Sequence, residues 1–314
     1  MAKKKISIIS SAYNEQDNVR ELYIRVKAEM TKHAGKYDYE QIVLDNASTD
    51  NTLEELRKLA AEDKNFKVIA NARNFGHIRS PYYGILQCHG DAVIYLASDL
   101  QDPPELISQF IEQWEKGYFV VLGQKQKSNE SPLFFLVRKA YYMLLNLVND
   151  SGAQLPANCT GFGLFDKQVV DQLRLLNDPY PYLRGLVCEL GYPKMLVPFT
   201  QPTRQRGLTK NNFYTLYDNA MIGFTNHSKV PLRLAAFIGF VVGGISLFLA
   251  LIYLILKLIY WNHFPMGTAP LLLAVLFFSS VQLLFLGILG EYIGAILTQV
   301  LKRPLVIEKE RINF

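Results

Sequence analysis

Two long apolar segments constrain this chain more than any other feature. Residues 232–260 and 269–300 are almost entirely apolar, and each exceeds the roughly 20 residues that a helix needs to cross a bilayer. The connection between them, residues 261–267, is short and begins with a tryptophan, a residue typical of the membrane–water interface. We therefore expect residues 231–300 to form a hairpin of two transmembrane helices.

Basic residues indicate the orientation of this hairpin. Lys229 and Arg233 lie at the start of the first apolar segment, Lys302 and Arg303 follow the second, and the connecting loop has no lysine or arginine. Because cytoplasmic flanks are enriched in these residues, we expect a multi-pass protein of the inner (plasma) membrane with both termini in the cytoplasm. The N-terminus has a short basic lead and no apolar signal-peptide core, which agrees with this orientation.

The composition of the chain limits the kinds of binding partner that we expect. The net charge of +5 is modest and no arginine-rich tract is present, so we expect no nucleic-acid binding. Gly287, Gly290 and Gly294 give the second apolar segment a close-packing face, which suits its partner helix or a second subunit in a homo-oligomer. The cysteines lie far apart without metal-ligand spacing, so we interpret them as reduced core residues: Cys88, Cys159 and Cys188.

Residues 1–230 have the pattern of a separate α/β domain, followed by the hairpin and by a cytoplasmic tail at 301–314. Apolar runs of strand length alternate with amphipathic segments of helix length, which is typical of βαβ units and a mostly parallel sheet covered on both faces. Polar residues follow the carboxyl end of each strand, at 13–15, 45–50, 73–77 and 99–102. Since open α/β sheets bind ligands at that edge, we expect one shared ligand crevice.

The stretch that follows the apolar run 92–96 suggests a metal site. Asp99, Gln101 and Asp102 come directly after this predicted strand, and two prolines separate them from a helix that opens near Glu105. Carboxylate and amide oxygens suit a hard cation such as Mg²⁺ or Mn²⁺. The alternative is that Asp99 and Asp102 merely cap a turn and a helix.

Four strings resemble, in order and spacing, the motifs of glycosyltransferase family 2. They are Ala12-Tyr13-Asn14-Glu15, Asp45-Asn46-Ala47-Ser48-Thr49-Asp50, Arg73-Asn74-Phe75-Gly76-His77 and Asp99-Leu100-Gln101-Asp102-Pro103-Pro104-Glu105. The chain looks most like the polyprenyl-phosphate glycosyltransferases, namely dolichyl-phosphate mannose synthase and the bacterial undecaprenyl-phosphate glucosyl- and aminoarabinosyl-transferases. Similar strings at 182–186, 204–210 and 290–294 extend the resemblance over nearly the whole chain. It implies a GT-A fold, a Rossmann-like, mostly parallel sheet.

The resemblance also implies roles for the crevice residues. Tyr13, Glu15 and Asp45 would hold the base and ribose of a nucleotide-sugar donor. Asp99 and Gln101 would bind the Mg²⁺ or Mn²⁺ ion that bridges the donor's diphosphate. Asn74 and His77 belong to the string that would approach the diphosphate, although a structural role for His77 is an equal alternative. Asp99 and Asp102, together with Arg204 and Lys210, are the expected catalytic residues.

Three positions depart from the family pattern. Relatives usually carry an acid two residues before the metal aspartate, where this chain has Ala97. Many relatives also carry an acid and an arginine where this chain has Gly161 and Gly163. Asp102, a diphosphate oxygen or water would then complete the metal shell, and the identity of the donor sugar is less constrained than the type of reaction.

A lipid phosphate acceptor would need cations to hold it. Its second pKa lies near ~6, so it is largely dianionic at neutral pH and needs no general base to attack the sugar. Arg138, Arg204, Thr209 and Lys210 are the candidates for this contact. The alternative is that these cations form a solvated basic face or contact anionic lipid headgroups.

Two amphipathic segments indicate how the domain would meet the bilayer. Residues 131–148 and 212–224 combine aromatic and aliphatic side chains with basic ones, as interfacial helices do. They would dock the crevice against the membrane that presents the acceptor. The alternative is that they are core helices of the domain.

The expected function is a metal-dependent, inverting transfer of one sugar from a nucleotide donor to a polyprenyl phosphate at the cytoplasmic membrane face. Glucose from UDP-glucose and undecaprenyl phosphate are the favoured pair, and GDP-mannose or another nucleotide sugar is the alternative donor. A processive polysaccharide synthase would carry more spans and a Gln-x-x-Arg-Trp string, which the sequence lacks. A non-catalytic, membrane-tethered nucleotide-sugar scaffold is the alternative from another class, and Ala97 leaves room for it.

Overall fold

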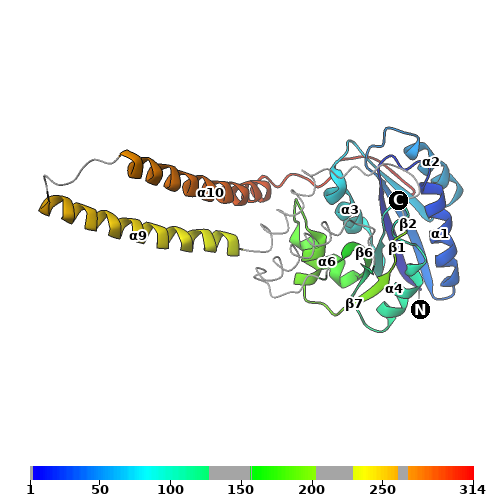
Figure 1. The fold of residues 1–314 in the computed structure, drawn as a ribbon. Helices are drawn as coiled ribbons and strands as arrows, with labels where there is room; N and C mark the ends of the chain where they lie inside the picture. The colour runs from blue at the N-terminus through cyan, green and yellow to red at the C-terminus, as the bar shows by residue number, and fades with distance from the viewer. Residues whose placement is uncertain (1–2, 127–155, 157, 203–228, 261–267) are drawn as a thin grey trace.

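An eight-stranded mixed sheet forms the centre of the N-terminal domain in this computed structural model (Figure 1). The structure describes residues 3–126, 156, 158–202, 229–260 and 268–314. In spatial order the strands are β7 (Lys194–Phe199), β5 (Val120–Lys125), β6 (Cys159–Asp166), β4 (Ala92–Tyr95), β1 (Lys4–Ala12), β2 (Tyr37–Asp45), β3 (Phe66–Asn71) and β8 (Glu308–Ile312).

Parallel pairing dominates this sheet. Strand β1 pairs in parallel with β2 and β4, β2 pairs in parallel with β3, and β5 pairs in parallel with β7. Strand β6 runs antiparallel between β4 and β5, and β8 runs antiparallel along β3. The expectation of an α/β domain with a mostly parallel sheet is therefore confirmed.

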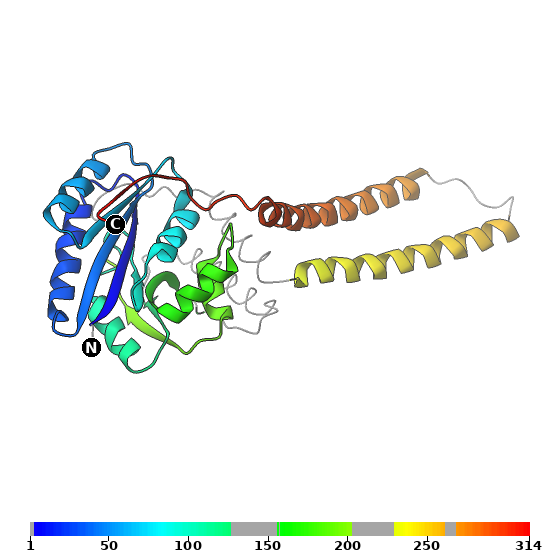
Figure 2. The ribbon, with the colours of Figure 1, turned by 180° about the vertical axis from the view of Figure 1, so that it is seen from behind.

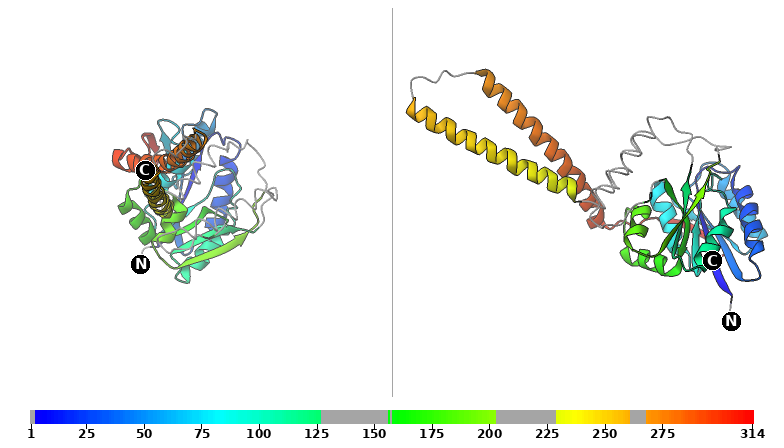
Figure 3. Two further views of the ribbon diagram at one scale, coloured as in Figure 1. Left: turned by 60° about the vertical axis from the view of Figure 1, so that its left-hand side comes forward. Right: turned by 60° about the horizontal axis from the view of Figure 1, so that its bottom comes forward.

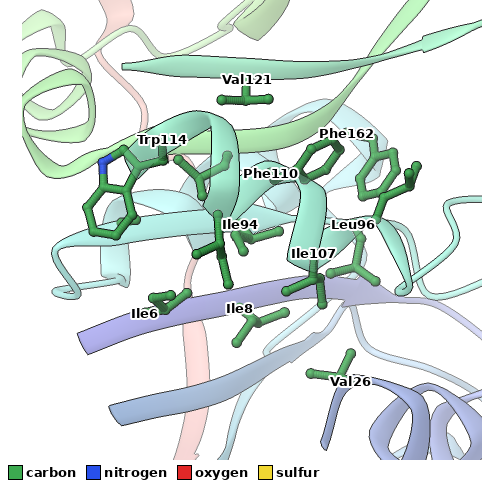
Figure 4. Packing of buried hydrophobic residues seen from close by; sticks show 14 of the residues in the cluster. Ile6, Ile8, Val26, Ile94, Leu96, Ile107, Phe110, Trp114, Val121 and Phe162 are labelled. Atoms are coloured by element: carbon green, nitrogen blue, oxygen red, sulfur yellow. The ribbon is translucent and has the colours of Figure 1, made fainter. Parts of the chain in front are cut away.

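Helices cover both faces of the sheet because successive buried side chains of its strands point to opposite faces. Ile6 and Ile8 of β1 belong to one core cluster, which α1 (Val19–Lys32) and α4 (Leu106–Glu115) cover (Figure 4). Ile9 points to the opposite face and packs in a second cluster with α3 (Gly76–Gln87) and α6 (Lys167–Leu176). Helix α2 (Thr52–Glu62) and the short α7 (Leu183–Glu189) complete the layers. The three cysteines are buried without disulfides, as expected for core residues.

Two long apolar helices project from the domain (Figures 1 and 3). They are α9 (Val230–Ile259) and α10 (Thr268–Leu301), and many of their large apolar side chains face outward. A Cβ at Gly239 of α9 would lie 4.0 Å from the Phe285 ring of α10, so the helices touch there. Among the described residues Phe277–Leu301 is long and apolar enough to cross a membrane, while Leu232–Ser246 is a shorter apolar stretch. One of the two expected spans thus meets the requirement.

After α10 the chain returns to the domain and adds β8 to the sheet (Figure 2). Side-chain contacts to two helices fix this strand. The Tyr83 hydroxyl of α3 donates to Glu308 Oε1 at 2.8 Å, and Asn313 Nδ2 donates to the carbonyl of Ala60 in α2 at 2.6 Å. The Ala72 backbone N–H donates to the Ile307 carbonyl at 2.9 Å. The segment expected to be a cytoplasmic tail therefore contains a strand of the N-terminal domain's sheet.

Candidate active site

The carboxyl ends of four parallel strands meet at one edge of the sheet. The register places Ala12 of β1 opposite Asp45 of β2, and Asp45 opposite Ala70 of β3. Beyond the strand ends, Asn46 N donates to the Ala12 carbonyl at 2.9 Å, and the loop after β4 is held by a bond from Ser98 Oγ to a carbonyl of β1 at 2.8 Å. The four polar strings therefore share one edge, as the sequence predicts.

The loop after β1 is tied to the loop after β2. Asn14 N donates to Ser48 Oγ at 3.0 Å, and Thr49 N donates to Asn14 Oδ1 at 2.8 Å. Glu15 N donates to Thr52 Oγ1 at 2.9 Å, and the Glu15 carboxylate itself is nearly buried. These bonds fix the segment that carries Tyr13 and Glu15 against the segment that carries Asp45.

Asp45 lies at the bottom of this pair of loops. Its side chain is buried, and its carboxylate oxygens accept the Ser48 N–H at 3.2 and 3.4 Å. Burial raises the pKa of Asp45, the hydrogen bonds from Ser48 oppose that shift, and the negative charge of Asp50 adds to it. A buried carboxylate of this kind suits hydrogen bonds from a polar ligand such as a nucleobase or ribose.

Three residues with strained backbone conformations lie at the same edge of the sheet. Asn14, Ala47 and Leu100 have φ angles of 57°, 59° and 60°, the left-handed region that side chains with a Cβ rarely adopt. Such conformations cost on the order of 1–3 kcal/mol each and persist where the surrounding structure enforces them, often at functional sites. Each residue lies in one of the crevice loops, after β1, β2 and β4 respectively, so the strain marks the site independently of the motifs.

The predicted metal residues lie in the loop after β4. Asp99 Oδ1 accepts the Gln101 N–H at 3.1 Å, and Asp102 Oδ2 accepts the Ala97 N–H at 3.0 Å. Asp99 and Gln101 are half-buried, whereas Asp102 is buried. Burial raises the pKa of Asp102 to about 6, the Ala97 N–H and Lys125 of β5 oppose this shift, and Asp99 adds to it.

The side chains of this loop are of the kinds that bind divalent cations. Asp99, Gln101 and Asp102 supply carboxylate and amide oxygens, and a cation would relieve the repulsion between the two carboxylates. The part of the chain that the structure describes has no group of three or more His, Cys, Asp or Glu side chains placed to hold a metal ion. The described side chains therefore supply part of a coordination shell, and a bound diphosphate would have to supply more.

Asn74 and His77 flank the start of α3. Asn74 Oδ1 accepts the Gly76 N–H at 2.8 Å and an Asn46 amide hydrogen at 2.9 Å, so this side chain holds the loop in place. His77 lies in the first turn of α3, where the partial positive charge of a helix N-terminus favours an anionic ligand.

The two glycines that depart from the family pattern have local reasons. A Cβ at Gly163 would lie 2.2 Å from the Val121 carbonyl oxygen, a contact no side chain can make. Gly161 has a φ of +93°, which disfavours any other residue. The structure therefore excludes a side chain at Gly163 and disfavours one at Gly161. Sequence reasoning noted these glycines but not their cause, which depends on the approach of β5.

The expected acceptor residues cannot be placed in this site. Arg138, Arg204, Thr209 and Lys210 lie outside the described residues, as do the expected interfacial helices at 131–148 and 212–224. What sequence reasoning missed inside the described part is Asn46, whose contacts join three loops, and β8, which contacts the loop after β3. Both depend on pairings distant in sequence, and no local pattern signals them.

A parallel sheet with polar loops at the carboxyl ends of its strands is typical of α/β enzymes that bind nucleotides there. The model of "Glycosyl transferase family 2" matches residues 7–174, more than half of the chain. The chain therefore belongs to glycosyl transferase family 2, and it is a glycosyltransferase with a GT-A-like α/β domain.

Similar proteins extend this likeness over the full length. The glycosyltransferase YkcC of Bacillus subtilis is 35% identical over 303 residues, 96% of this chain and 92% of that protein. The SfII prophage-derived bactoprenol glucosyl transferase of Shigella flexneri is 31% identical over 307 residues, 98% of each chain. Glucosyl-3-phosphoglycerate synthase of Mycobacterium tuberculosis, solved with Mn²⁺, UDP-glucose and phosphoglyceric acid, is 16% identical over 71% of this chain and 78% of that one. The TM-score of that comparison is 0.48.

Proposed function

We propose that this glycosyltransferase moves one sugar from a nucleotide donor to a polyprenyl phosphate at the membrane surface. Glucose from UDP-glucose is the favoured donor, and GDP-mannose or another nucleotide sugar is the alternative. The observation that carries this proposal is the full-length likeness to proteins named bactoprenol glucosyl transferases, which extends through the apolar helices as well as the catalytic domain. A polyprenyl acceptor resides in the membrane, so apolar helices that anchor the protein there would keep it next to its acceptor.

In this proposal each loop at the carboxyl ends of the strands binds a different part of the donor. Tyr13, Glu15 and buried Asp45 hold the nucleoside, and the start of α3 with Asn74 and His77 faces the diphosphate. Asp99 and Gln101 hold Mg²⁺ or Mn²⁺, and Asp102 fixes that loop by accepting the Ala97 N–H. When bound, the cation neutralises the charge that develops on the departing diphosphate.

The acceptor phosphate is the nucleophile of this reaction. One of its oxygens attacks the anomeric carbon as the bond to the diphosphate breaks, which inverts that carbon in one displacement. Arg138, Arg204, Thr209 and Lys210 are proposed to hold the phosphate, and Arg204 and Lys210 to assist the transfer. Because cations orient a dianion without removing a proton, no general base is required.

We further propose that α9 and α10 together form a two-helix transmembrane hairpin, with the catalytic domain and both termini in the cytoplasm. Support comes from the apolar composition of both helices, their outward-facing side chains and the basic residues that flank them. Segments 131–148 and 212–224 would bring the crevice to the bilayer surface. Packing of the glycine face of α10 against a second copy would give a homo-oligomer.

The test is transfer of radiolabelled sugar into a chloroform-extractable lipid by the full chain in lipid nanodiscs that contain a polyprenyl phosphate. Several nucleotide sugars are compared, each with Mn²⁺, with Mg²⁺ and with a chelator. We expect metal-dependent labelling, highest with UDP-glucose. Asp99→Asn removes one negative charge at the cation, so we expect at least about a 100-fold lower rate.

Asp38→Asn is the matched control, because Asp38 is an exposed carboxylate at the opposite end of β2 from the crevice. It should keep wild-type transfer. If no nucleotide sugar labels the lipid, the protein is better explained as a nucleotide-sugar-binding scaffold. If Asp99→Asn keeps full turnover, the metal assignment is wrong.

A further inference from the structure

A buried polar cluster lies beneath the loops that follow β2 and β3. Asn46, Asn71 and Ser80 have exposed fractions of 4%, 2% and 0%, and they come from the loop after β2, from β3 and from α3 respectively. Burying polar side chains is unfavourable unless their hydrogen bonds are satisfied, and a network of such bonds fixes one arrangement of the segments it joins. In this cluster Asn71 Oδ1 is buried without a hydrogen-bond partner, whereas the side-chain polar atoms of Asn46 and Ser80 are paired. None of the three residues has a role in the proposed reaction.

Asn46 is the centre of this cluster. Its Oδ1 accepts from three donors: the Phe75 backbone N–H at 2.9 Å, Asn71 Nδ2 at 3.0 Å and Ser80 Oγ at 2.7 Å. An amide oxygen has two lone pairs, so three donors saturate it. Its Nδ2 donates to Asn74 Oδ1 at 2.9 Å and, at 3.3 Å, to the Gly76 carbonyl.

All five bonds reach one segment, which runs from the end of β3 through the first turns of α3. That segment carries Asn74 and His77, the residues proposed to face the diphosphate. Asn46 is itself anchored on the other side, because its backbone N–H donates to the Ala12 carbonyl of β1. It also directly follows Asp45, which is proposed to hold the nucleoside. Asn46 therefore joins the two loops that would bind the two ends of a nucleoside diphosphate.

We propose that Asn46 is the positioning residue of the donor site: it sets the distance between Asp45 and the loop at 74–77, and so selects a nucleoside diphosphate of fixed span. The proposal rests on the proposed function. Asn46 acts without touching the donor, since its own side chain is buried beneath both loops.

The oxygen and the nitrogen of the Asn46 amide contribute unequally to these hydrogen bonds. Three of the five bonds, including the one to the loop backbone at Phe75, go to the oxygen, while the nitrogen makes one short and one long bond. An aspartate at position 46 keeps the acceptor, and its charge is favourable near the N-terminus of α3. This variant loses the bond to Asn74 Oδ1, which still accepts the Gly76 N–H. An alanine removes one acceptor from three buried donors, of which Asn71 Nδ2 keeps a second acceptor in Ser80 Oγ at 3.1 Å.

The experiment compares Asn46→Ala and Asn46→Asp with the wild-type full chain in nanodiscs. Calorimetry measures the binding of UDP and of UDP-glucose with Mn²⁺, and steady-state transfer gives separate KM values for donor and polyprenyl phosphate. We expect Asn46→Ala to weaken UDP binding and raise the donor KM about tenfold or more, because unpaired buried donors disfavour the binding geometry. The acceptor KM should stay within about twofold, and Asn46→Asp within about threefold of wild type on every measure.

Leu173→Ala is the control for general destabilisation, because Leu173 is a fully buried residue of α6, a helix that none of the Asn46 hydrogen bonds reaches. It should lower the thermal midpoint and leave both KM values unchanged. An Asn46→Ala variant with wild-type UDP affinity overturns the proposal, as does an Asn46→Asp variant as impaired as Asn46→Ala. If the wild type binds UDP-glucose but labels no lipid, the proposed function fails while the role of Asn46 stands on the binding data.

Discussion

Replacing Asp102 by asparagine should stabilise the metal-free protein at neutral pH. The Asp102 carboxyl is buried in the loop after β4, and burial raises its pKa from the ordinary 3.8 to about 6. Ionising it in the folded state is therefore harder than in the unfolded chain. Asparagine has the same shape, and its Oδ1 can still accept the Ala97 N–H that Asp102 Oδ2 accepts at 3.0 Å.

The magnitude follows from the two pKa values. One pKa unit corresponds to about 1.4 kcal/mol, so a rise from 3.8 to about 6 costs the folded state about 3 kcal/mol once the group is ionised. The folded state binds this proton more tightly than the unfolded state does. The contribution of Asp102 to the free energy of unfolding therefore falls as pH rises from about 4 to about 6 and is constant above that. The asparagine of the Asp102→Asn variant does not titrate, so it would carry no such dependence.

The assay is thermal unfolding of wild type and Asp102→Asn from pH 4.5 to pH 8, with a chelator present. For a domain of this size 1 kcal/mol moves the midpoint by about 2–4 °C, so the variant should unfold about 6 °C or more above wild type at pH 7.5. The difference between the two proteins cancels the other carboxyl groups that titrate in this range. A difference that is the same at pH 4.5 and pH 7.5, or a less stable variant, would refute the reasoning. Mn²⁺ with UDP-glucose should narrow the gap by stabilising the ionised form.

Two further substitutions test the packing of the sheet. Gly163→Ala should destabilise the domain by about 1–3 kcal/mol, because its Cβ would lie 2.2 Å from the Val121 carbonyl oxygen and β5 would have to move; an unchanged midpoint in thermal unfolding would contradict this. Asn313→Ala should destabilise by about 1–3 kcal/mol, because its Nδ2 donates to the carbonyls of Ala60 at 2.6 Å and Phe66 at 2.8 Å. It should also speed proteolysis of the segment after α10, and wild-type resistance to protease would exclude the anchoring role.

The sequence predicts the central sheet and the edge at which its polar loops meet, because both depend on local patterns. The apolar runs that became β1 to β4 are each followed by polar residues, so the carboxyl-end edge could be identified before any pairing was known. The position of β8 could not, because Glu308–Ile312 is a short, charged strand that follows two apolar helices, and its partner β3 lies far back in the chain.

The same distinction applies within the site. The positions of Asp99 and Gln101 are predictable since they follow a strand end directly, and that of Asp45 because it closes β2; their roles stay predictions. Asn46 belongs to a recognisable string, but its role depends on Asn71, Phe75 and Ser80, which lie 25 to 34 residues away. The raised pKa of Asp102 depends on its burial, which spacing alone does not give.

Strand β8 also has a consequence for how the molecule is made. It follows α10 in the chain, so during synthesis the ribosome completes both apolar helices before the residues that cover β3 emerge. Until then β3 is an open edge strand, available for unwanted pairing with other chains. The domain therefore reaches its mature stability only after both apolar helices have been synthesised.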